Sequence, residues 1–212
     1  MLILLGLPPE GVKVFAVLFH SHLLGKKLKL RHFRGNELPP ISKDDNYDNS
    51  YQDYRLLENE VTILPDDHLI LECTYNSIGR TKPTFGGFTV DDEICLSFIM
   101  YYPSSSLVSS FSCPSPFNVL ISLGVIEMSQ DDRFVISPIT GKNETYFEFL
   151  NTYPWDEYSV NAVQRSMKNS PHLHICMNKQ GKPIHTFTLA RYPFGVKSYE
   201  EPDICKHELN FD

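Results

Sequence analysis

Short strand-like segments separated by turn residues fill the first half of the chain and limit what it can fold into. Between residues 12 and 103, apolar or alternating runs follow one another with almost no helical period. Turn signals recur every ~8–12 residues, a spacing that favours sandwiches and barrels over helical bundles. We therefore expect an antiparallel β-sandwich over residues 12–103.

The first of these runs, from Val14 to Gly25, is apolar, β-branched and aromatic, and it predicts a buried strand. Residues 26–34 alternate charged and apolar side chains, which is typical of a strand with one face in water. Pro39 and Pro40 exclude a central strand at their position, because proline has no N–H to donate to a neighbour. Further strands are expected at residues 61–64, 68–75 and 92–102.

His20 and His22 stand near the end of the first run, with Ser21 between them. Residues i and i+2 of a strand point to the same face, so the two imidazoles would lie side by side. Imidazole is a good ligand for copper and zinc, which makes His20 and His22 a candidate metal-binding pair. The alternative is a pair of surface or packing histidines, the more frequent origin of a His-x-His pattern.

The composition changes after Pro103. Residues 104–116 are rich in serine and proline, and the segment beyond them has few strong patterns. We expect helices at residues 117–124, 143–150 and 158–167, and strands at 172–177 and 183–190. The second His-x-His pair, His172 and His174, lies in this part and is interpreted as packing or surface histidines.

Charge and hydropathy exclude several classes of protein. The net charge of −7 and the absence of a basic face argue against a nucleic-acid partner. No apolar stretch reaches the ~18–20 residues that a membrane span needs, and residues 1–7 lack the basic region of a signal peptide. Hydrolase and nucleotide-binding motifs are also absent from the sequence.

Cysteines and a sequon point to an oxidising compartment. The five cysteines are widely spread without a CxxC pair, which argues against zinc-finger and thioredoxin-like sites. Asn143 begins the N-glycosylation sequon Asn-Glu-Thr, which matters in a secretory protein. We therefore expect the secretory pathway, a vesicle lumen or the extracellular space. An odd cysteine count without a signal peptide indicates a piece of a longer protein.

Eight motifs follow one another in a specific order. They are His20-Ser-His22-Leu-Leu-Gly25, Arg31-His-Phe-Arg34, Thr62-Ile-Leu-Pro-Asp66, Leu71-Glu-Cys-Thr-Tyr-Asn76, Gly79-Arg80, Phe85-Gly-Gly-Phe88, Asp92-Glu-Ile-Cys-Leu-Ser-Phe98 and Tyr101-Tyr-Pro103. In this order and spacing the chain resembles the C-terminal domain of the copper type II, ascorbate-dependent monooxygenases, and their dopamine β-hydroxylase-like branch fits best. The similarity is close over residues 8–113 and weaker as far as residues 200–205.

The resemblance implies a jelly-roll-like β-sandwich that carries one catalytic copper ion. It divides the chain into a copper-binding core, residues 1–113, and an irregular C-terminal extension, residues 114–212, packed on or continuing the same domain. In the family, copper activates O₂ and hydroxylates a C–H bond, here of a phenylethylamine-like or other small amine. A second copper in a preceding domain, which this chain does not include, relays electrons from ascorbate.

Carried over by position, His20 and His22 match the histidine ligands of that copper. The family's third ligand is a methionine directly before a cysteine, and this chain has Ile94 before Cys95. Isoleucine has no donor atom. Met100 is the nearest candidate replacement, but it would lie ~20 Å from position 94 along the strand. We therefore expect weak copper binding and no turnover from this chain alone. The alternative is a non-catalytic remnant that serves as a binding or dimerisation module. A homo-oligomer is a further expectation for this chain.

The resemblance also accounts for the cysteines. Cys73 and Cys95 match an intradomain disulfide between neighbouring strands. Cys113 and Cys176 match cysteines whose partners lie upstream of residue 1, and Cys205 matches one that reaches a preceding domain. The resemblance therefore predicts the Cys73–Cys95 bond within this chain.

Overall fold

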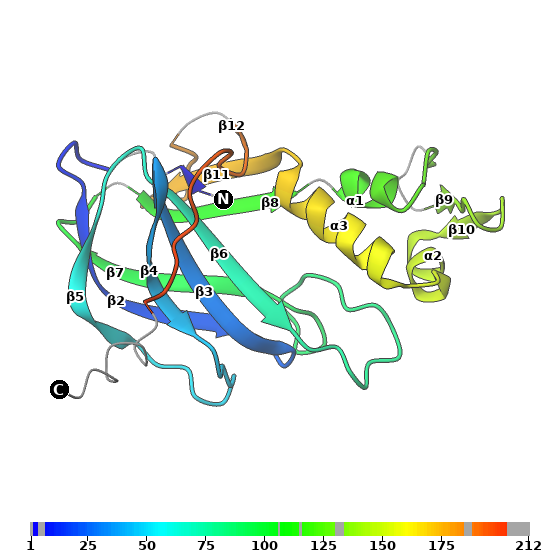
Figure 1. Ribbon diagram of the computed structural model, residues 1–212, viewed down its shortest axis with the longest axis horizontal. Helices are drawn as coiled ribbons and strands as arrows, with labels where there is room; N and C mark the ends of the chain where they lie inside the picture. Colours follow the sequence, from blue (N-terminus) through cyan, green and yellow to red (C-terminus); the bar gives the residue numbers. More distant parts are fainter. Residues whose placement is uncertain are drawn as a thin grey trace, which may run out of the picture.

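The computed structural model describes residues 2–3, 7–105, 107–114, 116–129, 134–184 and 188–202. Its strands are β1 (Leu2–Ile3), β2 (Val12–Ser21), β3 (Gly25–Arg34), β4 (Asn36–Asp44), β5 (Arg55–Ile63), β6 (His68–Tyr75), β7 (Cys95–Tyr102), β8 (Leu107–Pro114), β9 (Phe134–Ile136), β10 (Asn143–Thr145), β11 (His172–Asn178) and β12 (Thr188–Ala190). Its helices are α1 (Pro116–Ser122), α2 (Tyr146–Thr152) and α3 (Glu157–Asn169). The described part is mainly β, as predicted (Figure 1).

Antiparallel sheets stack to form a β-sandwich in the first half of the chain (Figure 1). One sheet has the strand order β1-β6-β3-β4 and the other β5-β2-β7. Apolar side chains from both sheets pack into one buried cluster, with Val14 and Phe19 from β2 and Leu28 and Leu30 from β3. The alternation of buried and exposed residues along β3 follows from its alternating sequence, because successive side chains of a strand point to opposite faces. The expected sandwich is confirmed.

β4 contains both prolines and lies at the edge of its sheet. Its pairing with β3 shifts register between Leu30 and His32, and Pro39 and Pro40 fall in this irregular part of the ladder. An edge strand tolerates proline because one side of its backbone has no neighbour to bond. The prolines therefore exclude a central strand, as expected, and still permit an edge strand.

One strand was not expected from the sequence, and two expected elements start later than predicted. The serine-rich segment 104–116 contains strand β8, which pairs with β11 in a further sheet of order β12-β11-β8. The helix expected at residues 143–150 starts at Tyr146, because Asn143–Thr145 pairs with β9. The strand expected at residues 92–102 starts at Cys95.

The segment around the three helices has a hydrophobic cluster of its own, formed by Leu120, Leu123, Val125, Val135 and Phe149. Figure 1 shows this segment at one end of the molecule, beyond β8 and β11. Thr145 caps α2 through a reciprocal capping box with Glu148. Within the described residues, no helix is long and apolar enough to span a membrane. The division of the chain at residue 113 stays a prediction.

Candidate metal centre

The two candidate ligands lie at the end of β2. His20 is opposite Leu96 of β7, and the ladder ends one residue later with Ser21 opposite Cys95. His22 follows directly after the strand. The ring centroids of His20 and His22 are 5.3 Å apart at an interplanar angle of 85°, and both side chains are half-buried. The structure therefore brings the two imidazoles together at one rim of the sandwich.

Both imidazoles use Nδ1 for a contact with a carbonyl oxygen. His20 Nδ1 lies 2.5 Å from Oε1 of Gln52, and His22 Nδ1 lies 3.1 Å from the carbonyl oxygen of Asp92. The Gln52 amide is oriented by its own Nε2, which donates to the carbonyl of Asn49 at 2.7 Å. A carbonyl oxygen only accepts, so both contacts are hydrogen bonds in the tautomer that carries the proton on Nδ1, and in that neutral tautomer Nε2 has the free lone pair. Metal-binding histidines commonly have this arrangement, so this donor set fits a metal ion that prefers imidazole.

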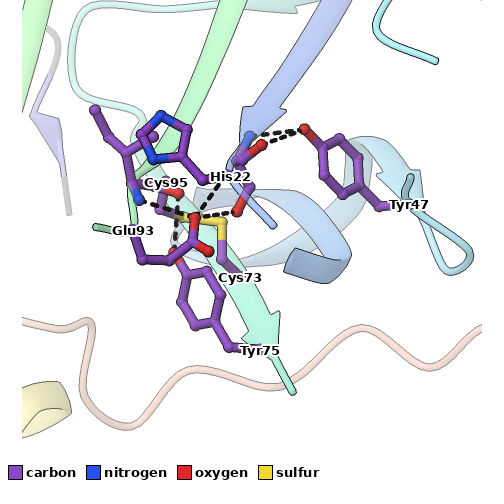
Figure 2. The surroundings of a disulfide bond; sticks show 8 residues. His22, Tyr47, Cys73, Tyr75, Glu93 and Cys95 are labelled. Atoms are coloured by element: carbon purple, nitrogen blue, oxygen red, sulfur yellow. Dashed lines mark hydrogen bonds between the residues drawn. A yellow bond between two sulfur atoms is a disulfide. The ribbon is translucent and has the colours of Figure 1, made fainter. Parts of the chain in front are cut away.

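A buried carboxylate supports the histidine segment from behind. Glu93 Oε1 accepts hydrogen bonds from Ser21 Oγ at 2.8 Å, from the N–H of His22 at 2.6 Å and from the N–H of Ile94 at 2.9 Å (Figure 2). Glu93 Oε2 accepts from the N–H of Leu24 at 2.9 Å. Burial raises the pKa of this carboxyl, but the hydrogen bonds outweigh burial and hold the pKa below its ordinary value. Glu93 is therefore ionised at neutral pH.

Tyr47 completes the support of Ser21. Its hydroxyl accepts from the N–H of Ser21 at 2.8 Å and donates to the carbonyl of Ser21 at 2.7 Å. Tyr47 is buried, whereas Tyr51 and Tyr54 are exposed. Burial raises the pKa of the Tyr47 hydroxyl, so it stays protonated and able to donate. Tyr47 also packs into the buried cluster of the sandwich.

Ile94 lies between the Glu93 network and a disulfide. Cys73 of β6 and Cys95 of β7 form the bond that the resemblance implies (Figure 2). The Ile94 carbonyl accepts from the Tyr75 hydroxyl at 3.1 Å. Burial, together with the neighbouring Glu93 charge, raises the pKa of Tyr75 to about 12. The backbone of residue 94 is thus held on both sides, while its side chain offers no atom to a metal.

No other side chain of the described residues completes the pair as a third histidine, cysteine or carboxylate ligand. Met100 is opposite Ala16, whereas His20 is opposite Leu96. That displacement along β7 corresponds to roughly 13 Å, because a strand rises about 3.3 Å per residue. Met100 therefore does not replace the missing thioether.

The second His-x-His pair belongs to the β8–β11 sheet. His174 is 2% exposed, and its Nε2 lies 2.9 Å from Ser110 Oγ. His172 Nε2 donates to the carbonyl of Met167 at 2.7 Å. Burial lowers the pKa of both histidines. His174 is packed within the sheet and His172 is half-buried, which agrees with their interpretation as packing or surface histidines. His174 also lies 3.5 Å from Cys176 Sγ.

The sequence also led to predictions about the other three cysteines and the sequon. The pairing of Cys113 and Cys176 stays a prediction, and Cys205 lies outside the described residues. Asn143 is exposed at the start of β10. Its glycosylation also stays a prediction.

Comparison with known proteins decides the family. The model of a family described as "Copper type II ascorbate-dependent monooxygenase, C-terminal domain" matches residues 3–119, more than half of the chain. The chain belongs to this family. This monooxygenase-family chain is 41% identical to DBH-like monooxygenase protein 1 of Mus musculus over 205 residues, which cover 93% of the chain and 33% of that protein.

Two further relatives agree with this family assignment. DBH-like monooxygenase protein 1 of Homo sapiens is 40% identical over 152 residues, 69% of the chain and 25% of that protein. Dopamine beta-hydroxylase of Equus caballus is 38% identical over 200 residues, 93% of the chain and 32% of that protein. The chain thus spans about a third or less of the length of these relatives.

Sequence reasoning missed the groups that support the histidines. Gln52, Glu93 and Tyr47 are far from His20 and His22 in the sequence, and nothing in their local pattern marks them as partners of the pair. The signal that could have pointed to Glu93 is its place at the end of the acidic run Asp91–Glu93, directly before Ile94 and a strand-like segment.

Proposed function

We propose that this chain is the copper-binding C-terminal domain of a dopamine β-hydroxylase-like monooxygenase, and that His20 and His22 hold one copper ion through Nε2. The observation that supports this most strongly is the bonding of both Nδ1 atoms, to Gln52 and to the Asp92 carbonyl. It leaves the same nitrogen available on two neighbouring rings. Family membership supports copper as the metal.

Bound copper would supply the redox chemistry that couples O₂ to hydroxylation of a C–H bond, with ascorbate as the reductant. The substrate class that we propose is a phenylethylamine-like or other small amine. The chain's own contribution is positional. His20 and His22 hold the ion, and Gln52 and the Asp92 carbonyl keep the protons on Nδ1.

Ile94 sets the limit of this proposal. A thioether favours Cu(I), and position 94 offers none, so two imidazoles hold the ion more weakly. We infer that this chain alone has no turnover and depends on a preceding domain with a second copper.

The Cys73–Cys95 bond supports a place in the secretory pathway. Expression through that pathway should add a glycan whose mass disappears in Asn143→Gln.

A second candidate function is a non-catalytic binding or dimerisation module. Ile94 favours it, because a domain without catalysis has no need of the methionine. The two candidates differ in whether copper binds at His20 and His22.

The experiment is a Cu(I) competition titration of the purified chain and of a His20→Ala/His22→Ala variant. The matched control is His172→Ala/His174→Ala, which removes a His-x-His pair in the β8–β11 sheet. We expect one copper ion per chain in the wild type and in the control, and loss of that ion in the first variant. Equal copper binding by the wild type and the His20→Ala/His22→Ala variant would refute the copper proposal and favour the module.

A further inference from the structure

The Glu93 carboxylate joins two segments that are distant in the sequence. Its Oε1 accepts from the N–H of His22, 71 positions away, and from the N–H of Ile94, the next residue. Ser21 Oγ donates to the same oxygen at 2.8 Å. Glu93 is 9% exposed and Ser21 is fully buried. A single buried anion therefore contacts the backbone of a proposed copper ligand and the backbone of the position that lacks one.

Sheet pairing does not reach either of these backbone positions. The β2–β7 ladder ends with Ser21 opposite Cys95. His22 and Ile94 therefore both lie one residue beyond this end of the ladder. Here the Glu93 carboxylate accepts hydrogen bonds from the N–H groups of His22 and Ile94, as the carbonyl of a neighbouring strand would do within a sheet. Figure 2 shows His22 above the Glu93 side chain and Tyr75 below it.

We propose that Glu93 is the positioning residue of the copper site. Its carboxylate fixes the distance and orientation of His22 relative to position 94, and through Ser21 it fixes the strand end that carries His20. This proposal rests on the function proposed above, because it assigns Glu93 a role at that copper site. Glu93 does not contact copper itself. It acts through the backbone of His22.

Glu93→Gln is the variant that tests this role. Glutamine keeps the shape and one acceptor oxygen, but its NH₂ group faces an N–H donor where the second oxygen stood. The network then loses at least one hydrogen bond and its charge, and the His22 backbone shifts or gains freedom. Loss of an outer partner of a metal ligand typically weakens metal affinity ~10–100-fold. We expect a loss in this range for Cu(I).

The matched control is Glu37→Gln. Glu37 lies on β4 in the other sheet, its side chain is 5% exposed, and it forms a hydrogen-bonded ion pair with Arg31. It therefore measures what loss of a buried, paired carboxylate does to the fold alone. We expect Glu37→Gln to lower the unfolding midpoint and to leave copper affinity unchanged.

Two readouts on the copper-loaded chain separate positioning from stability. The first is the Cu(I) dissociation constant, and the second is the electron paramagnetic resonance spectrum of the Cu(II) form, which reports the arrangement of the imidazoles. Glu93→Gln should change both, and Glu37→Gln neither. If Glu93→Gln does not fold, Ser21→Ala removes one bond of the same network and should alter the spectrum in the same direction.

The results distinguish the two proposals. A wild type that binds copper, with a Glu93→Gln variant of the same affinity and spectrum, refutes the role of Glu93 and leaves the copper function intact. Equal losses in Glu93→Gln and Glu37→Gln also refute it, because the effect would then be general. A wild type that binds no copper through His20 and His22 refutes the function, and the positioning role falls with it.

Discussion

His20 Nδ1 lies 2.5 Å from the amide oxygen of Gln52, a residue 32 positions later in the sequence. Replacing Gln52 with leucine removes the acceptor that keeps the proton on Nδ1, so the tautomer and orientation of the ring are no longer fixed. We expect Cu(I) affinity to fall ~10-fold or more, the usual scale for such partners. Because Gln52 is exposed, thermal stability should change little.

The control for Gln52→Leu is Gln180→Leu, at an exposed glutamine in the turn after β11. It introduces the same apolar surface without touching either imidazole, and copper affinity should stay at the wild-type value. Unchanged affinity in Gln52→Leu would show that the contact with His20 has no part in metal binding.

Ile94→Met restores a thioether at the position that the family resemblance assigns to the third ligand. The backbone there is already held by the Glu93 carboxylate and the Tyr75 hydroxyl, so the new side chain should reach the ion without rearrangement. We expect Cu(I) affinity to rise by about tenfold or more, with no gain in Ile94→Leu, which adds no donor. Competition titrations of both variants provide the measurement. Equal affinities would mean that position 94 does not face the ion.

The Cys73–Cys95 bond closes a loop with a sequence separation of 22 residues. Removing it by the double serine substitution should lower the free energy of unfolding by about 3 kcal/mol, mainly because the unfolded chain gains freedom. Urea unfolding of the variant and of the wild type, each with and without reductant, measures the change. Reductant should bring the wild type to the level of the variant. A variant as stable as the oxidised wild type would contradict this account.

Asp67 makes stability depend on pH on the acid side. Burial raises the pKa of its carboxyl, but hydrogen bonds from Arg34, the N–H of Leu64 and His32 outweigh burial and lower the pKa. The folded-state pKa therefore lies below the unfolded value of about 3.9. The stabilisation is present above that value and is lost as pH falls through the folded-state pKa. Asp67→Asn should be less stable than the wild type near pH 7, with a gap that shrinks in acid.

Urea midpoints measured between about pH 7 and pH 2.5 test this dependence on ionisation of Asp67. The control is Asp66→Asn, at the exposed neighbour in the same turn. Its midpoints should follow those of the wild type throughout. A constant gap between Asp67→Asn and the wild type at every pH would show that the carboxylate charge does not contribute.

Local sequence patterns predicted the strands in which the order of apolar and polar residues by itself indicates a buried and an exposed face. The expected strand at residues 68–75 has the same bounds as β6, and β3 follows the alternation of residues 26–34. β8 was missed because its serines favour turns locally, and its strand form depends on pairing with β11, about 60 residues later. The site shows the same limit. The spacing of His20 and His22 predicted their shared location, but their partners Gln52 and Glu93 come together only in the folded chain.

The hydrogen bonds that position residue 94 involve only its main chain, because its N–H donates to Glu93 and its carbonyl accepts from Tyr75. Neither bond depends on which side chain stands there. In the genetic code, the single methionine codon differs from each isoleucine codon in one base. Exchange of one nucleotide would therefore place a thioether at residue 94 without a second, compensating change, and would complete the donor set that the family resemblance implies.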